Sequence, residues 1–176
     1  MRRLLQTLNY IKADIKRHRG STLTSFLYIY MFNPSFRLIL NYRLGAYFYN
    51  SEYKILKIIA NYYKHRQIIK RSCQISYSAN IGTNIHFPHP IGIVIGDGVV
   101  IGNNVSIWQQ VTLGSHGKKE EKKKYPLVGD NVKIYSGSII LGDVQIGECA
   151  IVAAGAVVTK NVPAHKVAVG VPALIK

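Results

Sequence analysis

The chain has 176 residues and a formal net charge of +15, which allows one main domain and a smaller one. Most Lys and Arg residues fall within residues 1–71, where Asp14 and Glu52 are the acids. Such a charge can attract nucleic acid, an anionic membrane surface or an acidic polymer. We expect no nucleic-acid partner, because the sequence has neither zinc-finger spacing nor an RNA-binding signature. The two cysteines lack ligand spacing, which argues against a metal site or a disulfide framework and favours the cytoplasm.

Residues 1–71 predict a helical amino-terminal segment that caps the domain after it. Lys12 and Lys16 come too early for a secretory leader. The uncharged run 20–36 is too short and polar to span a membrane, so we expect a soluble or peripheral protein. The basic, tyrosine-rich helical surface could also rest on the inner face of an anionic membrane. Apolar residues at helical spacing define four stretches: 3–18, 22–31, 35–50 and 52–69.

From residue 75 onward, an aliphatic residue returns every six positions. A helix needs apolar returns at three and four residues and a simple strand at two, so a period of six fits neither. It predicts a coil of short strands in which each hexad is one face of a triangular solenoid. We therefore expect a mainly β fold, a parallel β-helix, over 72–176. The recurring residues are Ile75, Ile81, Ile95, Ile101, Ile107, Leu113, Val128, Ile134, Ile140, Ile146, Val152 and Val158.

Two interruptions of the repeat bear on function. The spacing between Ile81 and Ile95 exceeds two hexads by two residues, and the surplus falls at 87–92, which contains His89. Residues 115–126 form a polar run that cannot continue the apolar core, so they must leave the coil as a loop. Such excursions from a rigid scaffold are where binding and catalytic residues tend to lie.

Several segments of the coil carry a resemblance to a known family. They are Val94-Ile95-Gly96, Val111-Thr112-Leu113-Gly114, Gly155-Ala156-Val157-Val158 and Val169-Gly170-Val171-Pro172-Ala173. Together they resemble the serine O-acetyltransferase family of left-handed β-helix (hexapeptide-repeat) acyltransferases, and in particular its branch in surface-polysaccharide pathways. The resemblance implies a left-handed coil, a homotrimer and acetyl-CoA as co-substrate, without a metal.

His89 matches the family's catalytic base and lies in the bulge at 87–92. Imidazole suits this role because its usual pKa of about 6.5 lets it accept a hydroxyl proton at neutral pH. A histidine that only makes a corner hydrogen bond beside two prolines is the structural alternative, and His86 is a weaker candidate for the base. Gly114 and Ser115 match the backbone N–H groups that hold the oxyanion.

The resemblance also implies the path of the cofactor. Ser136 and Ala154 match the backbone positions beside the pantetheine arm of acetyl-CoA, and small residues there permit close approach. Lys160 and Lys166 are candidate partners of the nucleotide phosphates. Both are equally well explained as ordinary solvated lysines.

Several family features are replaced in this chain. Gln74 stands where the family has the aspartate that orients the base, and Pro88 stands where it has a second aspartate. Lys124 and Tyr125 replace an arginine and a second histidine. We expect Gln74, Lys124 and Tyr125, with His116 from the loop, to contact the acceptor. A serine zwitterion would lose its charged partners at these positions, which favours a neutral, hydroxyl-rich sugar.

The leading prediction is an acetyl-CoA-dependent O-acetyltransferase that acts on a hydroxyl of a sugar or polysaccharide intermediate. The acetyl group would be transferred directly, with His89 as general base. The alternatives are a serine O-acetyltransferase of cysteine biosynthesis and a non-catalytic trimeric scaffold. Acetyl-CoA consumption that depends on an added hydroxyl compound would separate the scaffold from both enzymes.

Overall fold

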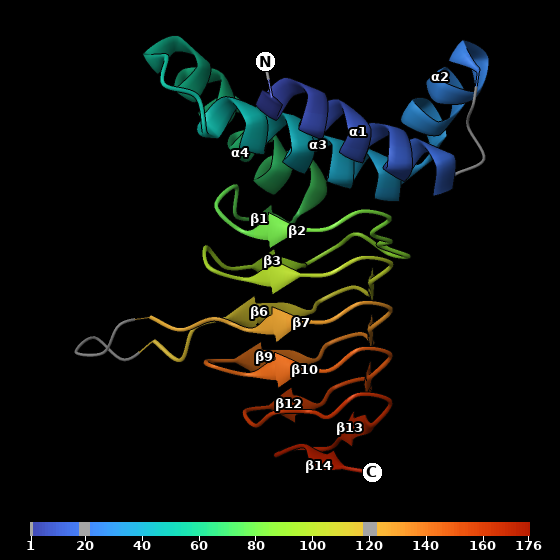
Figure 1. The fold of residues 1–176 in the computed structure, drawn as a ribbon, viewed down its shortest axis with the longest axis vertical. Helices are drawn as coiled ribbons and strands as arrows, with labels where there is room; N and C mark the ends of the chain where they lie inside the picture. Colours follow the sequence, from blue (N-terminus) through green and yellow to red (C-terminus); the bar gives the residue numbers. More distant parts are fainter. Residues whose placement is uncertain (1, 18–21, 118–122) are drawn as a thin grey trace.

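The computed structural model describes residues 2–17, 22–117 and 123–176. In this part of the chain, helices come first and short strands follow. The helices cover one end of a stack of strands, and the carboxyl terminus lies at the other end (Figure 1). The helices are α1 (Arg2–Arg17), α2 (Leu23–Phe32), α3 (Pro34–Tyr49) and α4 (Lys54–Arg71).

Local signals set the helix ends. The Thr22 side chain accepts a hydrogen bond from the backbone N–H of Ser25 (3.2 Å) at the start of α2. The Asn33 side chain accepts one from Phe36 N–H (2.9 Å) at the start of α3. Helix α4 ends at Arg71, and the C-cap residue Ser72 adopts a left-handed conformation with φ 49°. The helices predicted from the sequence are confirmed, with their ends shifted by one or two residues.

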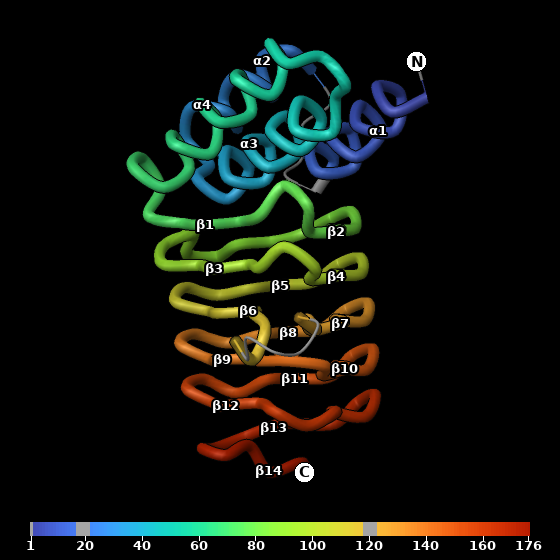
Figure 2. The backbone as a smooth tube through the Cα atoms, turned by 90° about the vertical axis from the view of Figure 1, so that its left-hand side faces the viewer, coloured from blue at the N-terminus to red at the C-terminus, as the bar shows by residue number. Residues whose placement is uncertain are grey.

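The strands are two or three residues long and form three sheets within the described residues. Consecutive strands mostly fall in different sheets, so the chain winds from sheet to sheet (Figure 2). The first sheet contains β1 (Gln74–Ile75), β3 (Val94–Ile95), β6 (Thr112–Gly114), β9 (Ile139–Leu141) and β12 (Val157–Val158). The second contains β2 (Asn80–Ile81), β4 (Val100–Ile101), β7 (Leu127–Val128) and β10 (Gln145–Ile146). The third contains β5 (Ser106–Ile107), β8 (Lys133–Ile134), β11 (Ile151–Val152), β13 (Val167–Val169) and β14 (Leu174–Ile175).

Parallel pairing aligns the hexads of successive turns. Ile95 pairs with Leu113, and Leu113 pairs with Ile140. All three side chains are at most 1% exposed, so the recurring aliphatic residues form a continuous internal column. The predicted hexapeptide repeat is confirmed. Parallel sheets capped by amino-terminal helices fit a left-handed β-helix.

A buried ion pair joins the helices to the first turn of the coil. Arg43 of α3 donates from Nε to Oδ2 of Asp14 in α1 over 3.0 Å, and both side chains are buried. Arg43 also donates to the carbonyl of Ile81 (2.7 Å), while the other carboxylate oxygen of Asp14 accepts from Asn84 N–H (3.0 Å). The phenol of Tyr42 donates to the Ala79 carbonyl over 2.6 Å. These polar contacts fix the helices relative to the coil.

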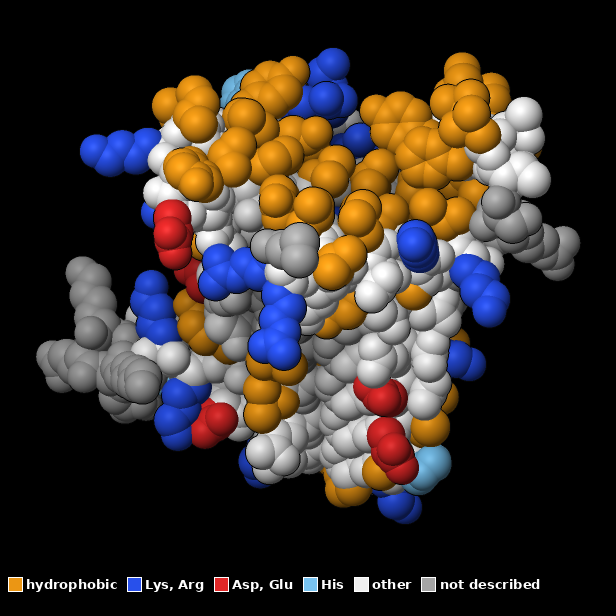
Figure 3. All heavy atoms as spheres, turned by 45° about the horizontal axis from the view of Figure 1, so that its top comes forward, with side chains coloured by type: hydrophobic (Ala, Val, Ile, Leu, Met, Phe, Trp, Pro, Cys, Tyr) orange, Lys and Arg blue, Asp and Glu red, His pale blue; other side chains and the backbone are white. Residues whose placement is uncertain are grey.

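The outer surface of the helices is apolar over a wide area (Figure 3). Among the helices of the described residues, none combines the length and the apolar character needed for a membrane span. The suggested contact with an anionic membrane stays a prediction. The exposed side chains include Leu4, Leu5 and Leu8 of α1, Leu27, Tyr28 and Phe32 of α2, and Ile55, Ile58 and Tyr62 of α4.

Candidate functional site

His89 lies in a bulge of the coil immediately before β3. The carbonyl of His89 accepts from Ile91 N–H over 2.8 Å, which makes the turn tight. Gly92 follows with φ 69° and donates its N–H to the Ser72 carbonyl (2.8 Å), at the end of α4. The Cys73 thiol, whose pKa is raised by burial, donates to the Pro90 carbonyl over 3.2 Å. The bulge is therefore held by Ser72 and Cys73, the residues that directly follow α4.

The side chain of His89 is exposed at a cavity of about 440 Å³ between the bulge and the helices. Arg37 of α3 and Lys70 and Arg71 of α4 line the same cavity. Among its lining residues there is no acid, so the cavity beside His89 is electropositive. The remaining lining residues are Pro34, Ser72, Pro88, Pro90 and Ile91.

Ser136 and Ala154 lie along the same edge of the coil as His89. Backbone hydrogen bonds connect the corners of successive turns there: Gln110 N–H to the Ile91 carbonyl (2.9 Å) and Gly155 N–H to the Ser136 carbonyl (2.9 Å). Between these two contacts, Gly137 N–H donates to the Gln109 carbonyl (3.0 Å) and joins the two middle turns. We call this the His89 edge (His89, Gln110, Ser136 and Ala154). It runs from the bulge toward the carboxyl-terminal end of the coil.

Other predicted site residues lie on a different edge, the loop edge (Gly96, Gly114, Tyr125 and Gly142). The Tyr125 ring packs so closely over the corner after β3 that a Cβ on Gly98 would lie 2.3 Å from it. Gly114 ends β6, and Ser115 follows it at this edge. Because His89 precedes β3 and Tyr125 packs on the residues after it, the two lie at opposite ends of that strand.

Two further loop residues have partners on the loop edge. His116 Cδ2 lies 3.5 Å from the position that a Cβ on Gly142 would take. The Lys124 ammonium forms an exposed ion pair with Asp143 over 2.7 Å. The predicted loop 115–126 includes residues 118–122, which lie outside the described residues. Within one chain, the loop edge and the His89 edge do not form a single site.

The remaining predicted residues are dispersed. Gln74 is exposed on β1, above Val94 of β3. Lys160 is exposed after β12, and Lys166 is exposed before β13, so neither lies on the His89 edge. The backbone of His86 bridges to β5 by accepting from Ile107 N–H (2.9 Å).

Sequence analysis missed the three cations beside His89. Lys70 and Arg71 occupy the last turn of α4, immediately before the coil, but the sequence does not show that this turn lies beside the bulge. Arg37 lies in α3, and nothing in the repeat indicates that α3 reaches the bulge. These residues come together only through the packing of helices on the coil.

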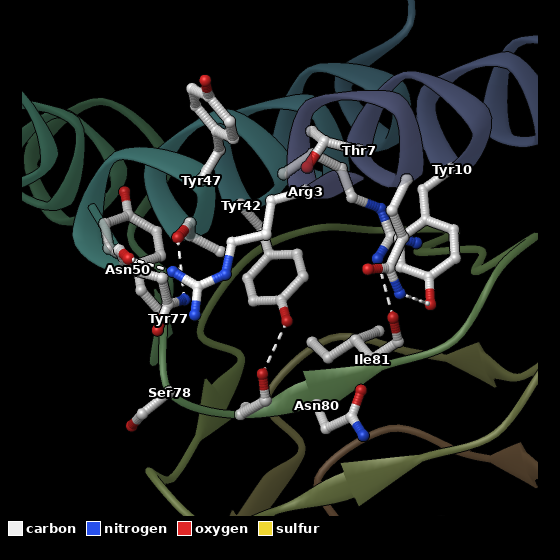
Figure 4. Close-up of a pocket in the computed structure, with 14 residues that line it drawn as sticks. Arg3, Thr7, Tyr10, Tyr42, Tyr47, Asn50, Tyr77, Ser78, Asn80 and Ile81 are labelled. Atoms are coloured by element: carbon white, nitrogen blue, oxygen red, sulfur yellow. Dashed lines mark hydrogen bonds between the residues drawn. The ribbon is translucent and has the colours of Figure 1, made fainter. Parts of the chain in front are cut away.

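A second cavity, of about 390 Å³, lies where α1 and α3 meet the first coil turn. Figure 4 shows Tyr42 and Arg3 reaching into it from the helices. Several polar groups around it already have partners within the chain: Arg3 donates to the Asn50 carbonyl and Tyr77 donates to Asn41 (3.1 Å). Because this cavity does not include His89, it is separate from the candidate site.

Residues 125–160 match the model of the bacterial transferase hexapeptide (six repeats). The serine acetyltransferase of Buchnera aphidicola from Acyrthosiphon pisum is 37% identical over 170 residues, covering 96% of this chain and 61% of that protein. The soybean serine acetyltransferase apoenzyme superposes with a TM-score of 0.83 at 34% identity, covering 97% of this chain and 69% of that one. A serine acetyltransferase in complex with CoA gives a TM-score of 0.79 at 32% identity, with coverages of 97% and 69%.

The chain spans about three-fifths of the length of the curated relatives it matches, since it covers 61% and 65% of the two Buchnera proteins. The relatives contradict the prediction of a sugar or polysaccharide acceptor, and they do not support membership of a polysaccharide-pathway branch. Both predictions rested on the family charges that are replaced at Pro88 and Tyr125, and these replacements alone do not define the acceptor. Taken with the parallel coil and its capping helices, the comparisons show that this chain belongs to the hexapeptide-repeat acyltransferases, as a homologue of the serine acetyltransferases.

Proposed function

We propose that the protein is an acetyl-CoA-dependent serine O-acetyltransferase. The observation that carries the proposal is the position of His89. On its helix side lies the electropositive cavity, and on its other side the His89 edge runs past Ser136 and Ala154. This arrangement supports an acceptor in the cavity and a cofactor along the edge, with an imidazole between them.

The proposed reaction is a direct transfer. His89 removes the proton from the serine hydroxyl as the oxygen attacks the thioester carbonyl of acetyl-CoA. Backbone N–H groups at Gly114 and Ser115 stabilise the resulting oxyanion. The carbon–sulfur bond then breaks, and the thiolate of coenzyme A takes the proton from the imidazolium of His89. The products are O-acetylserine and free coenzyme A, and no acyl-enzyme forms.

We propose that the active assembly is a homotrimer. Gly114, Ser115 and Tyr125 lie on the loop edge, whereas His89 lies at the other end of β3. A complete site therefore requires the His89 edge of one subunit to face the loop edge of the next. Light scattering of the purified protein should give a mass near three times 19.7 kDa. A fully active monomer would contradict this arrangement.

The proposed activity is tested by following free coenzyme A with a thiol reagent. Wild-type protein should release coenzyme A from acetyl-CoA only when L-serine is present, and mass spectrometry should detect O-acetylserine in equal amount. The control is the same reaction with L-alanine, which has the same charged groups but no hydroxyl. If coenzyme A release does not depend on L-serine, the proposed function is wrong.

A further inference from the structure

The electropositive cavity beside His89 brings together cations from separate parts of the chain. Arg37 comes from α3, and Lys70 and Arg71 come from the end of α4. No acidic side chain of the described residues lines this cavity. Its size, about 440 Å³, falls within the range of small-molecule sites. Fixed positive charge in a concave space of this size indicates an anionic ligand.

Two of these cations have buried donors that lack an acceptor. The Nε atoms of Arg37 and Arg71 are buried, and no group in the described part of the chain accepts a hydrogen bond from them. Burying a donor without a partner is unfavourable. Burial, with the nearby charges of Arg37 and Arg66, also lowers the pKa of Arg71 from its usual value. An anion in the cavity would offset the repulsion between these neighbouring cations.

Helix capping does not explain the cluster. Cations in the last turn of a helix interact favourably with its dipole, which accounts for Lys70 and Arg71 at the end of α4. Arg37, however, lies near the amino-terminal end of α3, where the dipole disfavours positive charge. A bound anion explains why Arg37 stands beside Lys70 and Arg71.

The cavity lies on the acceptor side of His89. Its walls are the ends of α3 and α4, whereas Ser136 and Ala154 lie on the turns that follow His89 toward the carboxyl terminus. The anion is therefore separated from the expected path of the cofactor. In the described residues, Lys124, which replaces the family's arginine, is already paired with Asp143 on the loop edge.

We propose that Arg37 and Arg71, assisted by Lys70, bind the carboxylate of the acceptor amino acid and thereby place its hydroxyl at His89. This inference rests on the proposed function. The planar guanidinium group pairs with both oxygens of a carboxylate, which an ammonium group cannot do. The ammonium group of the acceptor faces away from the cations because like charges repel. Arg37 and Arg71 are thus specificity-determining residues supplied by the helices.

Steady-state kinetics test the assignment. Arg37→Gln and Arg71→Gln should each raise the KM for L-serine by about 10- to 100-fold, the usual effect of losing a hydrogen bond to a charged group. The kcat and the KM for acetyl-CoA should stay within about threefold of wild type. The matched control is Lys57→Gln, which removes an exposed cation of α4 outside the cavity and should change neither constant. Arg71→Lys keeps the charge but loses the planar fork, and should give an intermediate KM.

A second substrate identifies the group that is bound. L-Serinamide has the hydroxyl of serine but no carboxylate, so the wild type should prefer L-serine to it by at least about tenfold in kcat/KM. The two arginine variants should lose most of this preference. If the variants instead raise the KM for acetyl-CoA, the cavity holds a cofactor phosphate and the inference is overturned. An unchanged KM for L-serine in both variants would also overturn it.

Calorimetric binding of L-serine in the absence of acetyl-CoA separates this inference from the proposed function. Wild type should bind L-serine, sulfate should compete with it, and Arg71→Gln should bind at least about tenfold more weakly. Binding with this dependence but without acetyl transfer would refute the proposed function and support the carboxylate site. Acetyl transfer to L-serine with no effect of Arg37→Gln or Arg71→Gln would support the function and refute the site.

Discussion

The helices and the coil bury their apolar residues differently. In the coil, recurring residues such as Ile107 and Ile134 are 0% exposed, because each turn covers the next. In the helices, Tyr28 is 67% and Ile58 is 63% exposed, so a large apolar surface faces outward. The coil is therefore stabilised by its own stacking, whereas the helices bury residues such as Phe36 and Ile39 and leave a wide apolar surface exposed. Those same helices supply the cations beside His89.

The largest stability effect should come from breaking the ion pair that joins the two regions. Asp14→Ala leaves Arg43 buried without its carboxylate, which should lower the free energy of unfolding by about 3–5 kcal/mol. The control is Asp143→Ala, which removes an exposed pair with Lys124 and should cost about 1 kcal/mol or less. Urea denaturation of both variants measures the difference. Equal effects would show that the buried pair does not fasten the helices to the coil.

The same substitution at one isoleucine in each region compares how much burial contributes to the free energy of unfolding. Ile134→Ala opens a cavity in the core of the coil and should lower the free energy of unfolding by about 2–5 kcal/mol. Ile58→Ala removes the same atoms from an exposed position on α4 and should change it by about 0.5 kcal/mol or less. A large loss for Ile58→Ala in the same denaturation experiment would mean that another surface covers this face of the helices.

Alkaline pH should weaken the contact between the regions. Burial raises the pKa of Tyr42 from 10.0 to about 12, so the folded chain keeps the phenolic proton that the unfolded chain releases. The Tyr42 phenol makes its full contribution to the free energy of unfolding below about pH 10. Between about pH 10 and 12 this contribution falls by up to about 1.4 kcal/mol for each pH unit. Denaturation at several pH values should show a shallower loss for Tyr42→Phe. An identical slope for both proteins would refute the role of Tyr42.

The smallest effect concerns the start of α3, which leads to Arg37. Asn33→Ala removes the side-chain acceptor for Phe36 N–H and should lower the free energy of unfolding by about 1 kcal/mol. Asn33→Ser keeps a good capping acceptor and should stay close to wild type. Thermal denaturation of the two variants provides the measurement. If both variants behave alike, the cap does not stabilise α3.

The coil was predictable because its six-residue repeat can be read directly along the sequence. A six-residue period places Ile95, Leu113 and Ile140 in one column, and the structure pairs them in that order. The same pattern locates the bulge at His89, because an insertion in a strict repeat is visible in the sequence alone. Capping residues such as Asn33 likewise mark the helix ends.

The set of cations beside His89 was not predictable, because it depends on tertiary packing. Arg37 and Arg71 are far from His89 in the sequence and meet it only when α3 and α4 pack on the first coil turn. Tyr125 and His89 lie at opposite ends of β3, so the prediction that both contact one acceptor requires a neighbouring subunit. The wrong prediction of a sugar acceptor arose from treating the replacements at Pro88 and Tyr125 as sufficient to define the acceptor.

The most direct test of the account is to compare wild type and His89→Ala in the L-serine-dependent release of coenzyme A. The variant should keep wild-type affinity for acetyl-CoA, measured by calorimetry, because the imidazole acts on the acceptor hydroxyl. Its turnover should fall by about 10²- to 10⁴-fold, the usual contribution of a positioned general base. Turnover of His89→Ala equal to that of wild type would contradict the central claim that His89 is the base.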